Sequence, residues 1–189
     1  MDSLTPVGFF GALTEVSARL ADLKAGTVGI GVVSLYAQPD AALYRLPLEH
    51  MRRFERAMER EIRGRLRAQD SLFAVDGKEW LIVLPNLSSA AVLTLAMLKF
   101  EQAFNEGPLE IDGIALPMRV VCGAAISPDH GKDAFHLLQS ARIAGLVGGR
   151  GDSGSQIYTP SMDESSPSMA SLERDLRNAF SGGTELELH

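Results

Sequence analysis

The sequence predicts an α/β fold in which helices cover a mixed central β-sheet. Apolar stripes at helical spacing alternate along the chain with short apolar or β-branched runs, a pattern typical of α/β domains. One pair of these short runs is separated by an Asp-Gly turn, which indicates a hairpin inside the sheet. The 189 residues suit one domain of ordinary size, and 46% of them are apolar, which is enough for a buried core.

The helices are predicted from apolar residues that recur every three to five positions, and the strands from short apolar runs bounded by turn residues. The clearest helix, 48–68, carries a run of arginines and glutamates that we interpret as its solvated face. In chain order, we predict a helix over 2–24, a strand over 28–36, a loop over 38–47, a helix over 48–68, hairpin strands over 71–75 and 79–84, a helix over 88–104, a strand over 118–126, a helix over 132–147 and a strand over 156–158.

Several glycines mark turns and loops. Asp76-Gly77 predicts a two-residue hairpin turn, in which both turn positions need a positive φ, and Asp112-Gly113 marks a second turn. The glycine-rich segment 148–154 is predicted as a flexible loop, because it lacks the Gly-Lys-Ser/Thr ending of a phosphate-binding loop and follows a helix.

Charge and composition exclude several functional classes. The net charge is -6, from 18 basic and 24 acidic residues, which argues against general nucleic-acid binding. We expect no membrane contact within this chain, since no apolar run approaches the ~18–20 residues that span a bilayer. The single cysteine, Cys122, lies in an apolar run and is predicted as a core residue, and one cysteine alone favours a reducing, cytoplasmic location.

Five local motifs occur in order along the first 160 residues. These motifs are Asp2-Ser3-Leu4-Thr5, Arg67-Ala68-Gln69-Asp70, Asp76-Gly77-Lys78-Glu79-Trp80, Gly123-Ala124-Ala125-Ile126-Ser127-Pro128 with Gly131, and Leu137-Leu138 with Ala141. Because their order and spacing match those of GGDEF domains, the family of the diguanylate cyclases, residues 1–160 resemble a GGDEF domain. The resemblance implies a nucleotidyl-cyclase-like sheet with a ferredoxin-like core and the signature motif on a hairpin.

The residues that the resemblance assigns to metal binding are missing. Active family members join two GTP molecules and hold divalent metals with an aspartate at the end of the first strand and with the acidic third residue of the signature. Here Ser34 is the nearest match to the first ligand, and Lys78 replaces the second with a cation. Glu79 keeps the fourth signature position, Asp76 replaces its first glycine, and Trp80 is predicted as core. We therefore expect no catalytic residues and no bound metal.

Of the other residues with which the family binds nucleotides, some are missing here and some are kept. The segment 38–43 lacks the asparagine with which the family binds guanine, and Arg150 is out of register with its phosphate-binding motif. Arg67 and Asp70, by contrast, keep both named residues of the R-x-x-D motif, which implies a cyclic di-GMP site of the inhibitory type. The alternative is a solvated ion pair at a helix end, and Lys99 is the one further cation on the helix 88–104.

The end of the chain predicts a link to a second domain. Residues 161–169 are polar and read as a linker, and 170–189 resemble the entry into an EAL domain, the cyclic di-GMP phosphodiesterase family. The resemblance implies that a C-terminal EAL domain of the same protein is the partner of this chain. The alternative is that residues 182–189 derive in part from an expression vector.

Three hypotheses follow for function. The first is a catalytically inactive GGDEF-type regulatory domain in cyclic di-GMP signalling, which modulates an attached EAL phosphodiesterase, with GTP or cyclic di-GMP as effector and no bound cofactor. The second is a structural module that forms a homodimer or other protein contacts without binding nucleotide. The third is a residual diguanylate cyclase that uses other ligands.

Overall fold

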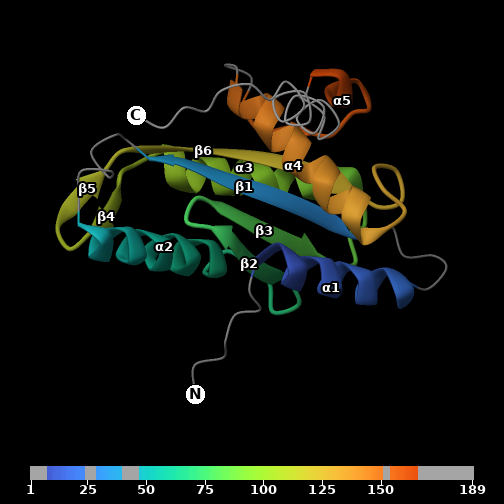
Figure 1. Ribbon diagram of the computed structural model, residues 1–189, viewed down its shortest axis with the longest axis horizontal. Helices are drawn as coiled ribbons and strands as arrows, with labels where there is room; N and C mark the ends of the chain where they lie inside the picture. Colours follow the sequence, from blue (N-terminus) through green and yellow to red (C-terminus); the bar gives the residue numbers. More distant parts are fainter. Residues whose placement is uncertain (1–7, 24–28, 40–46, 151–153, 166–189) are drawn as a thin grey trace, which may run out of the picture.

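A five-stranded sheet forms the centre of the molecule, with helices on both faces (Figure 1). The computed structural model describes residues 8–23, 29–39, 47–150 and 154–165. The strand order is β2-β3-β1-β6-β7; all neighbours are antiparallel except β6 and β7, so the predicted mixed sheet is confirmed. The strands are β1 (Gly31–Pro39), β2 (Ser71–Asp76), β3 (Glu79–Leu84), β6 (Met118–Ile126) and β7 (Gln156–Ile157).

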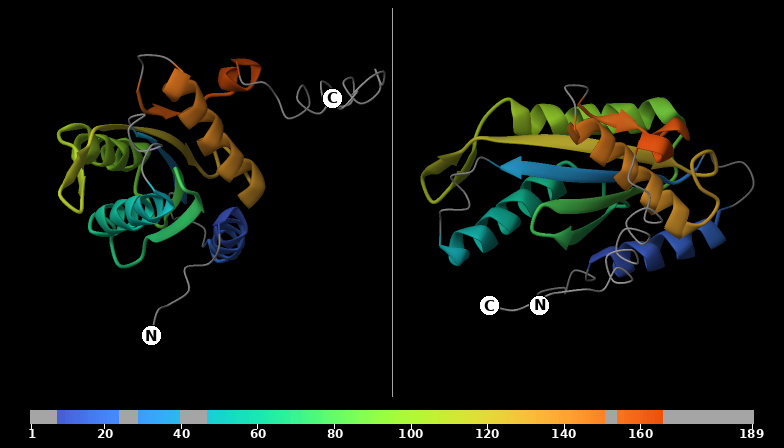
Figure 2. Two further views of the ribbon diagram at one scale, coloured as in Figure 1. Left: turned by 60° about the vertical axis from the view of Figure 1, so that its left-hand side comes forward. Right: turned by 45° about the horizontal axis from the view of Figure 1, so that its top comes forward.

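Two pairs of helices cover opposite faces of this sheet (Figure 2). The helices α2 (Leu48–Arg63) and α3 (Ala90–Asn105) pack on one face, and α1 (Gly8–Ala21) and α4 (Ala134–Arg150) pack on the other. Because successive side chains of a strand point to opposite faces, Val33 joins the core under α2 and α3, whereas Val32 joins the core under α1 and α4.

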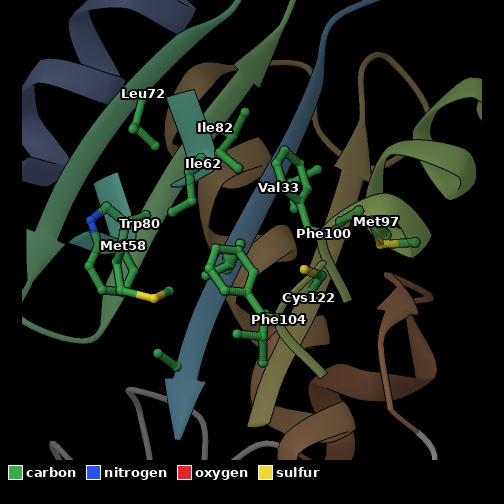
Figure 3. Close-up of a cluster of buried hydrophobic side chains, with 14 of the residues drawn as sticks. Val33, Met58, Ile62, Leu72, Trp80, Ile82, Met97, Phe100, Phe104 and Cys122 are labelled. Atoms are coloured by element: carbon green, nitrogen blue, oxygen red, sulfur yellow. The ribbon is translucent and has the colours of Figure 1, made fainter. Parts of the chain in front are cut away.

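The two core residues singled out from the sequence are buried as predicted (Figure 3). Trp80 is fully buried in the core under α2, where its ring lies edge-on to Phe54 at 6.4 Å between centroids. Cys122 is also fully buried, and burial raises the pKa of its thiol to about 12. Both side chains therefore serve packing and not ligand contact.

The two Asp-Gly turns are built differently. Asp112 and Gly113 have φ values of 53° and 79°, as predicted, and join two short strands that the sequence pattern did not reveal, β4 (Leu109–Ile111) and β5 (Ile114–Leu116). The predicted β2–β3 hairpin is confirmed, with Asp76 paired to Glu79, but the expected positive φ is wrong, because neither Asp76 nor Gly77 has one. The Asp76 carboxylate instead accepts hydrogen bonds from the amides of Lys78 (2.7 Å) and Glu79 (2.9 Å).

Several predicted boundaries were also wrong. The helix α4 extends to Arg150, so the predicted loop begins inside its last turn, where Gly148 packs so tightly that an added Cβ would lie 2.1 Å from the Gly154 carbonyl oxygen. The predicted linker begins with a short helix, α5 (Ser161–Ser165), anchored by buried Met162. β1 continues through the start of the predicted 38–47 loop, and the helix predicted over 48–68 ends at Arg63.

Other sequence predictions fall on parts of the chain that the structure does not describe. Residues 170–189, the predicted entry into an EAL domain, lie outside the described residues, as does the opening motif over 2–5. Among the described helices, none has the length and apolar character required to cross a bilayer.

We predict that Gly123→Ala destabilises the fold, because β6 and α4 approach most closely there. A Cβ on Gly123 would lie 1.9 Å from the Gly145 nitrogen and 2.2 Å from the Ala141 oxygen, both backbone atoms that cannot rotate away. The free energy of unfolding should fall by about 2 kcal/mol or more, measured by urea denaturation. Gly107→Ala is the control, since nothing lies within 4 Å of its added Cβ. Equal unfolding midpoints would contradict the prediction.

We also predict that protonation of His130 weakens the fold. Its Nδ1 accepts the Ile126 amide hydrogen at 3.1 Å, and its ring lies edge-on to Tyr158. Burial lowers the pKa of His130, so the unfolded chain takes up a proton first as the pH falls below about 6.5. The urea midpoint should therefore drop between pH 7.5 and pH 5. His130→Asn, which keeps an acceptor but does not titrate, should flatten this dependence; an unchanged slope would refute the assignment.

Candidate functional site

A cavity of about 290 Å³ opens between β1, the β2–β3 turn and α4. Three alternate residues of β1 point into it, because side chains two positions apart share one face of a strand. The two ends of the turn contribute carboxylates, and α4 contributes two arginines and a strip of small residues. The lining consists of Ser34, Tyr36, Gln38, Asp76, Glu79, Arg142, Gly145, Leu146, Gly149 and Arg150.

Glu79 is the buried acid of this cavity, with 5% of its surface exposed. Arg142 Nε donates to Glu79 Oε1 at 2.7 Å and Arg142 Nη2 donates to Oε2 at 2.8 Å, so the guanidinium binds the carboxylate in a bidentate manner. The Ser34 hydroxyl donates to Oε1 at 3.1 Å. Both carboxylate oxygens are therefore engaged, and the negative charge is neutralised within the protein.

The neighbours of Arg142 explain its orientation. Its guanidinium carbon lies 5.6 Å from the centre of the Phe9 ring on α1, within the range of a cation–π contact. The helix α4 thus reaches across to β3 while α1 supports the side chain that makes the link. Arg142, Tyr36 and Gln38 were not predicted as site residues from the sequence. A signal for Arg142 exists, since it directly follows Ala141, the last residue of the motif that begins at Leu137-Leu138.

The structure brings Ser34, Asp76 and Glu79 together at one cavity, as the resemblance implies for the first strand and the signature. Lys78 is not among the residues that line the cavity, and the cation that contacts Glu79 is Arg142. Asp76 directs one oxygen to the turn amides. Within the part of the chain that the structure describes, no three His, Cys, Asp or Glu side chains are grouped to hold a metal ion.

Arg67 and Asp70 form a compact ion pair in the turn that leads into β2. The Asp70 side chain is 4% exposed and accepts Arg67 Nη2 at 2.8 Å and the Arg67 amide at 2.8 Å. Arg67 Nη2 also approaches the Pro85 carbonyl oxygen at 3.4 Å. Hydrogen bonding to Asp70 raises the pKa of Arg67. The arginine is thus held in one orientation with about half of its side chain exposed, because 46% remains accessible.

This ion pair and residues of α3 line a groove of about 190 Å³. Its lining combines apolar side chains with three cations and Asp70, so it can accept a flat, anionic molecule. Lys99, the further cation expected from the sequence, is one of them. The lining consists of Arg65, Leu66, Arg67, Asp70, Leu84, Leu87, Val92, Leu95, Ala96, Lys99 and Phe100.

Neither a family model nor a curated protein matches this chain, whereas solved structures do. The GGDEF domain of YfiN (TpbB) from Pseudomonas aeruginosa is 22% identical, with a TM-score of 0.75, and the match covers 86% of this chain and 96% of that one. An EAL/GGDEF domain protein from M. capsulatus is also 22% identical, with a TM-score of 0.62 over 76% and 93% of the two chains.

A third similar structure holds a ligand. The GGDEF domain of DgcB from Caulobacter crescentus, in complex with cyclic di-GMP, is 14% identical, with a TM-score of 0.67 over 83% of this chain and 92% of that one. At identities of 22% or less, these similarities establish the fold and not the activity. The fold of this chain is therefore that of GGDEF domains.

Proposed function

We propose that this chain is a catalytically inactive GGDEF-type domain that regulates cyclic di-GMP signalling. The observation that carries the proposal is the closed hydrogen-bonding set of Glu79, which gives both carboxylate oxygens to Arg142 and one of them also to Ser34. Magnesium requires oxygen ligands with free lone pairs and octahedral geometry. Three hydrogen bonds use most of the lone pairs of Glu79, so a metal ion would have to displace Arg142 to gain full access to this carboxylate.

The electrostatic cost supports the same conclusion. If magnesium approached Glu79 while Arg142 stayed in place, the ion and the guanidinium would be about 4 Å apart. At an effective dielectric constant of about 20, their repulsion is on the order of 8 kcal/mol. The guanidinium therefore opposes a divalent ion at Glu79, and the position of the first family ligand holds the neutral hydroxyl of Ser34. Two GTP molecules would therefore lack the ions that align them for phosphoryl transfer.

We predict that the purified chain makes no cyclic di-GMP from GTP with Mg²⁺ or Mn²⁺, followed by chromatography of the nucleotides over hours. A domain of known cyclase activity run in parallel is the positive control. Arg142→Ala should remain inactive, because freeing Glu79 still leaves no aspartate at Ser34. Formation of cyclic di-GMP by the unmodified chain would refute the proposal and favour a residual cyclase.

The regulatory ligand that we propose is cyclic di-GMP, bound at Arg67 and Asp70. The bond to Asp70 fixes the guanidinium, so little side-chain entropy remains to be lost when it binds a phosphate. The apolar side chains that line the groove can receive a flat base, and Lys99 lies along the same groove as a second cation. One structural neighbour is described as a complex with cyclic di-GMP, which is consistent with this choice of ligand.

We predict that cyclic di-GMP binds the chain and that Arg67→Ala weakens binding at least about tenfold, because a charge-assisted contact is lost. Isothermal titration calorimetry measures both. Arg56→Ala removes the same charge from the exposed face of α2 and should leave affinity unchanged. Absence of heat with both cyclic di-GMP and GTP would reject the hypothesis that a nucleotide regulates this domain.

The attached EAL domain remains a prediction from residues 170–189. If it follows this chain, a ligand at Arg67 would bias the arrangement of the two domains by an amount of about 1–3 kcal/mol, which is typical of coupled sites. A similar structure described as an EAL/GGDEF domain protein is consistent with such a pairing.

One observation favours the alternative of a protein-interaction module. Phe10 on α1 and Phe135 on α4 are 78% and 51% exposed, and both rings lie edge-on to Phe9. Exposed aromatic side chains are enriched at protein interfaces. A homodimer or another protein could cover this pair of rings, and this function requires no nucleotide.

A further inference from the structure

The helix α1 contacts both of the regions described above. Near its start, Phe9 lies beneath the Arg142 guanidinium at 5.6 Å. Ten residues further along the helix, a distance of about 15 Å, Arg19 Nη2 donates to the Gln69 carbonyl oxygen at 3.2 Å. Gln69 belongs to the turn between Arg67 and Asp70. The views of Figure 2 place α1 beside the sheet edge formed by β2, on the same face as α4.

At the Arg19 end of α1, hydrogen bonds reach the two residues that flank Asp70 in the sequence. Glu15 Oε1 accepts hydrogen bonds from Arg19 Nε at 2.5 Å and from the Ser71 hydroxyl at 3.2 Å. Arg19 and Glu15 thus bind the residue before Asp70 and the residue after it. These bonds are about two-thirds buried, since 31% of the Arg19 side chain and 32% of the Glu15 side chain are exposed.

The helix α1 packs on the sheet through Ala12 and Val16, which are fully buried, and through Phe9, Leu13 and Leu20, which are partly buried against the same core. Its hydrogen bonds and its contact with Arg142 lie towards its two ends. These end contacts add direction to the apolar packing, because each fixes one named side chain or turn against the helix.

We propose that α1 is a common positioning element for the two sites. Glu15 and Arg19 set the turn that carries Arg67 and Asp70, Phe9 sets Arg142, and the rigid helix between them transmits a displacement of either end to the other. The inference concerns the protein without ligand and so does not depend on cyclic di-GMP binding. The β2–β3 hairpin also joins the two regions, but substitutions confined to α1 test the helix alone.

The experiment records nitrogen-15 NMR spectra of the ligand-free chain and follows the Nε–Hε signal of Arg142. Arg19→Ala should shift this signal, although Phe9, the α1 residue that contacts Arg142, lies ten residues from Arg19 along the helix. Arg19→Lys keeps a cation that can donate to the Gln69 carbonyl and should restore most of the original position. Ser17→Ala, an exposed change on the same helix, is the control and should leave the signal in place.

The reverse direction provides a second measurement. Phe9→Leu removes the ring beneath Arg142 and should shift the amide signals of Gln69 and Asp70. Changes confined to the immediate neighbours of each substituted residue, in both directions, would overturn the inference. Urea midpoints of all variants, measured alongside, identify any spectrum that reflects general destabilisation.

A ligand arm separates this inference from the proposed function. Cyclic di-GMP added to the unmodified chain should shift the Arg142 Nε–Hε signal, and Arg19→Ala should reduce that shift. If no signal moves with ligand, the proposed effector is wrong, while the ligand-free comparison still decides whether α1 links the two sites.

Discussion

The ion pair between Glu79 and Arg142 is the interaction on which the account of this domain depends. It brings a buried carboxylate from the sheet, the buried Ser34 hydroxyl and a partly exposed guanidinium from α4 into one hydrogen-bonded set. Arginine suits this role because its planar fork matches both carboxylate oxygens and its charge is permanent. The cation that pairs with this signature carboxylate is part of the chain itself, and this pairing is the basis of our proposal that the domain does not carry out metal-dependent phosphoryl transfer.

The close approach of α4 and β6 makes this ion pair geometrically possible. Gly123 and Gly145 allow backbone to pack against backbone, which brings α4 near enough for Arg142 to reach β3. Phe9 then holds the guanidinium from the side of α1. The second region, at Arg67, is organised by a different principle, since a local turn and one nearly buried carboxylate orient an exposed arginine. At Glu79 the charged side chains therefore pair with each other, whereas at Arg67 the cation is partly exposed to solvent.

The sequence predicted the sheet and its helices because their apolar periods are strong, as in the stripe that includes Phe54, Met58 and Ile62. It failed where tertiary contacts decide. The glycines at the end of α4 look like a loop, but Gly148 is required for packing against Gly154. The turn at Asp76 is set by side-chain hydrogen bonds and not by a left-handed backbone. The resemblance implied that Ser34 and the signature motif face one site, whereas Arg142, 63 residues from Glu79, becomes the partner of Glu79 only through the fold.

The most direct test is a crystal structure of the chain grown with Mg²⁺ and a GTP analogue that cannot be hydrolysed. We predict that Arg142 remains within hydrogen-bonding distance of both Glu79 oxygens and that no metal coordinates this carboxylate. A magnesium ion about 2.1 Å from a Glu79 oxygen, with Arg142 displaced, would contradict it.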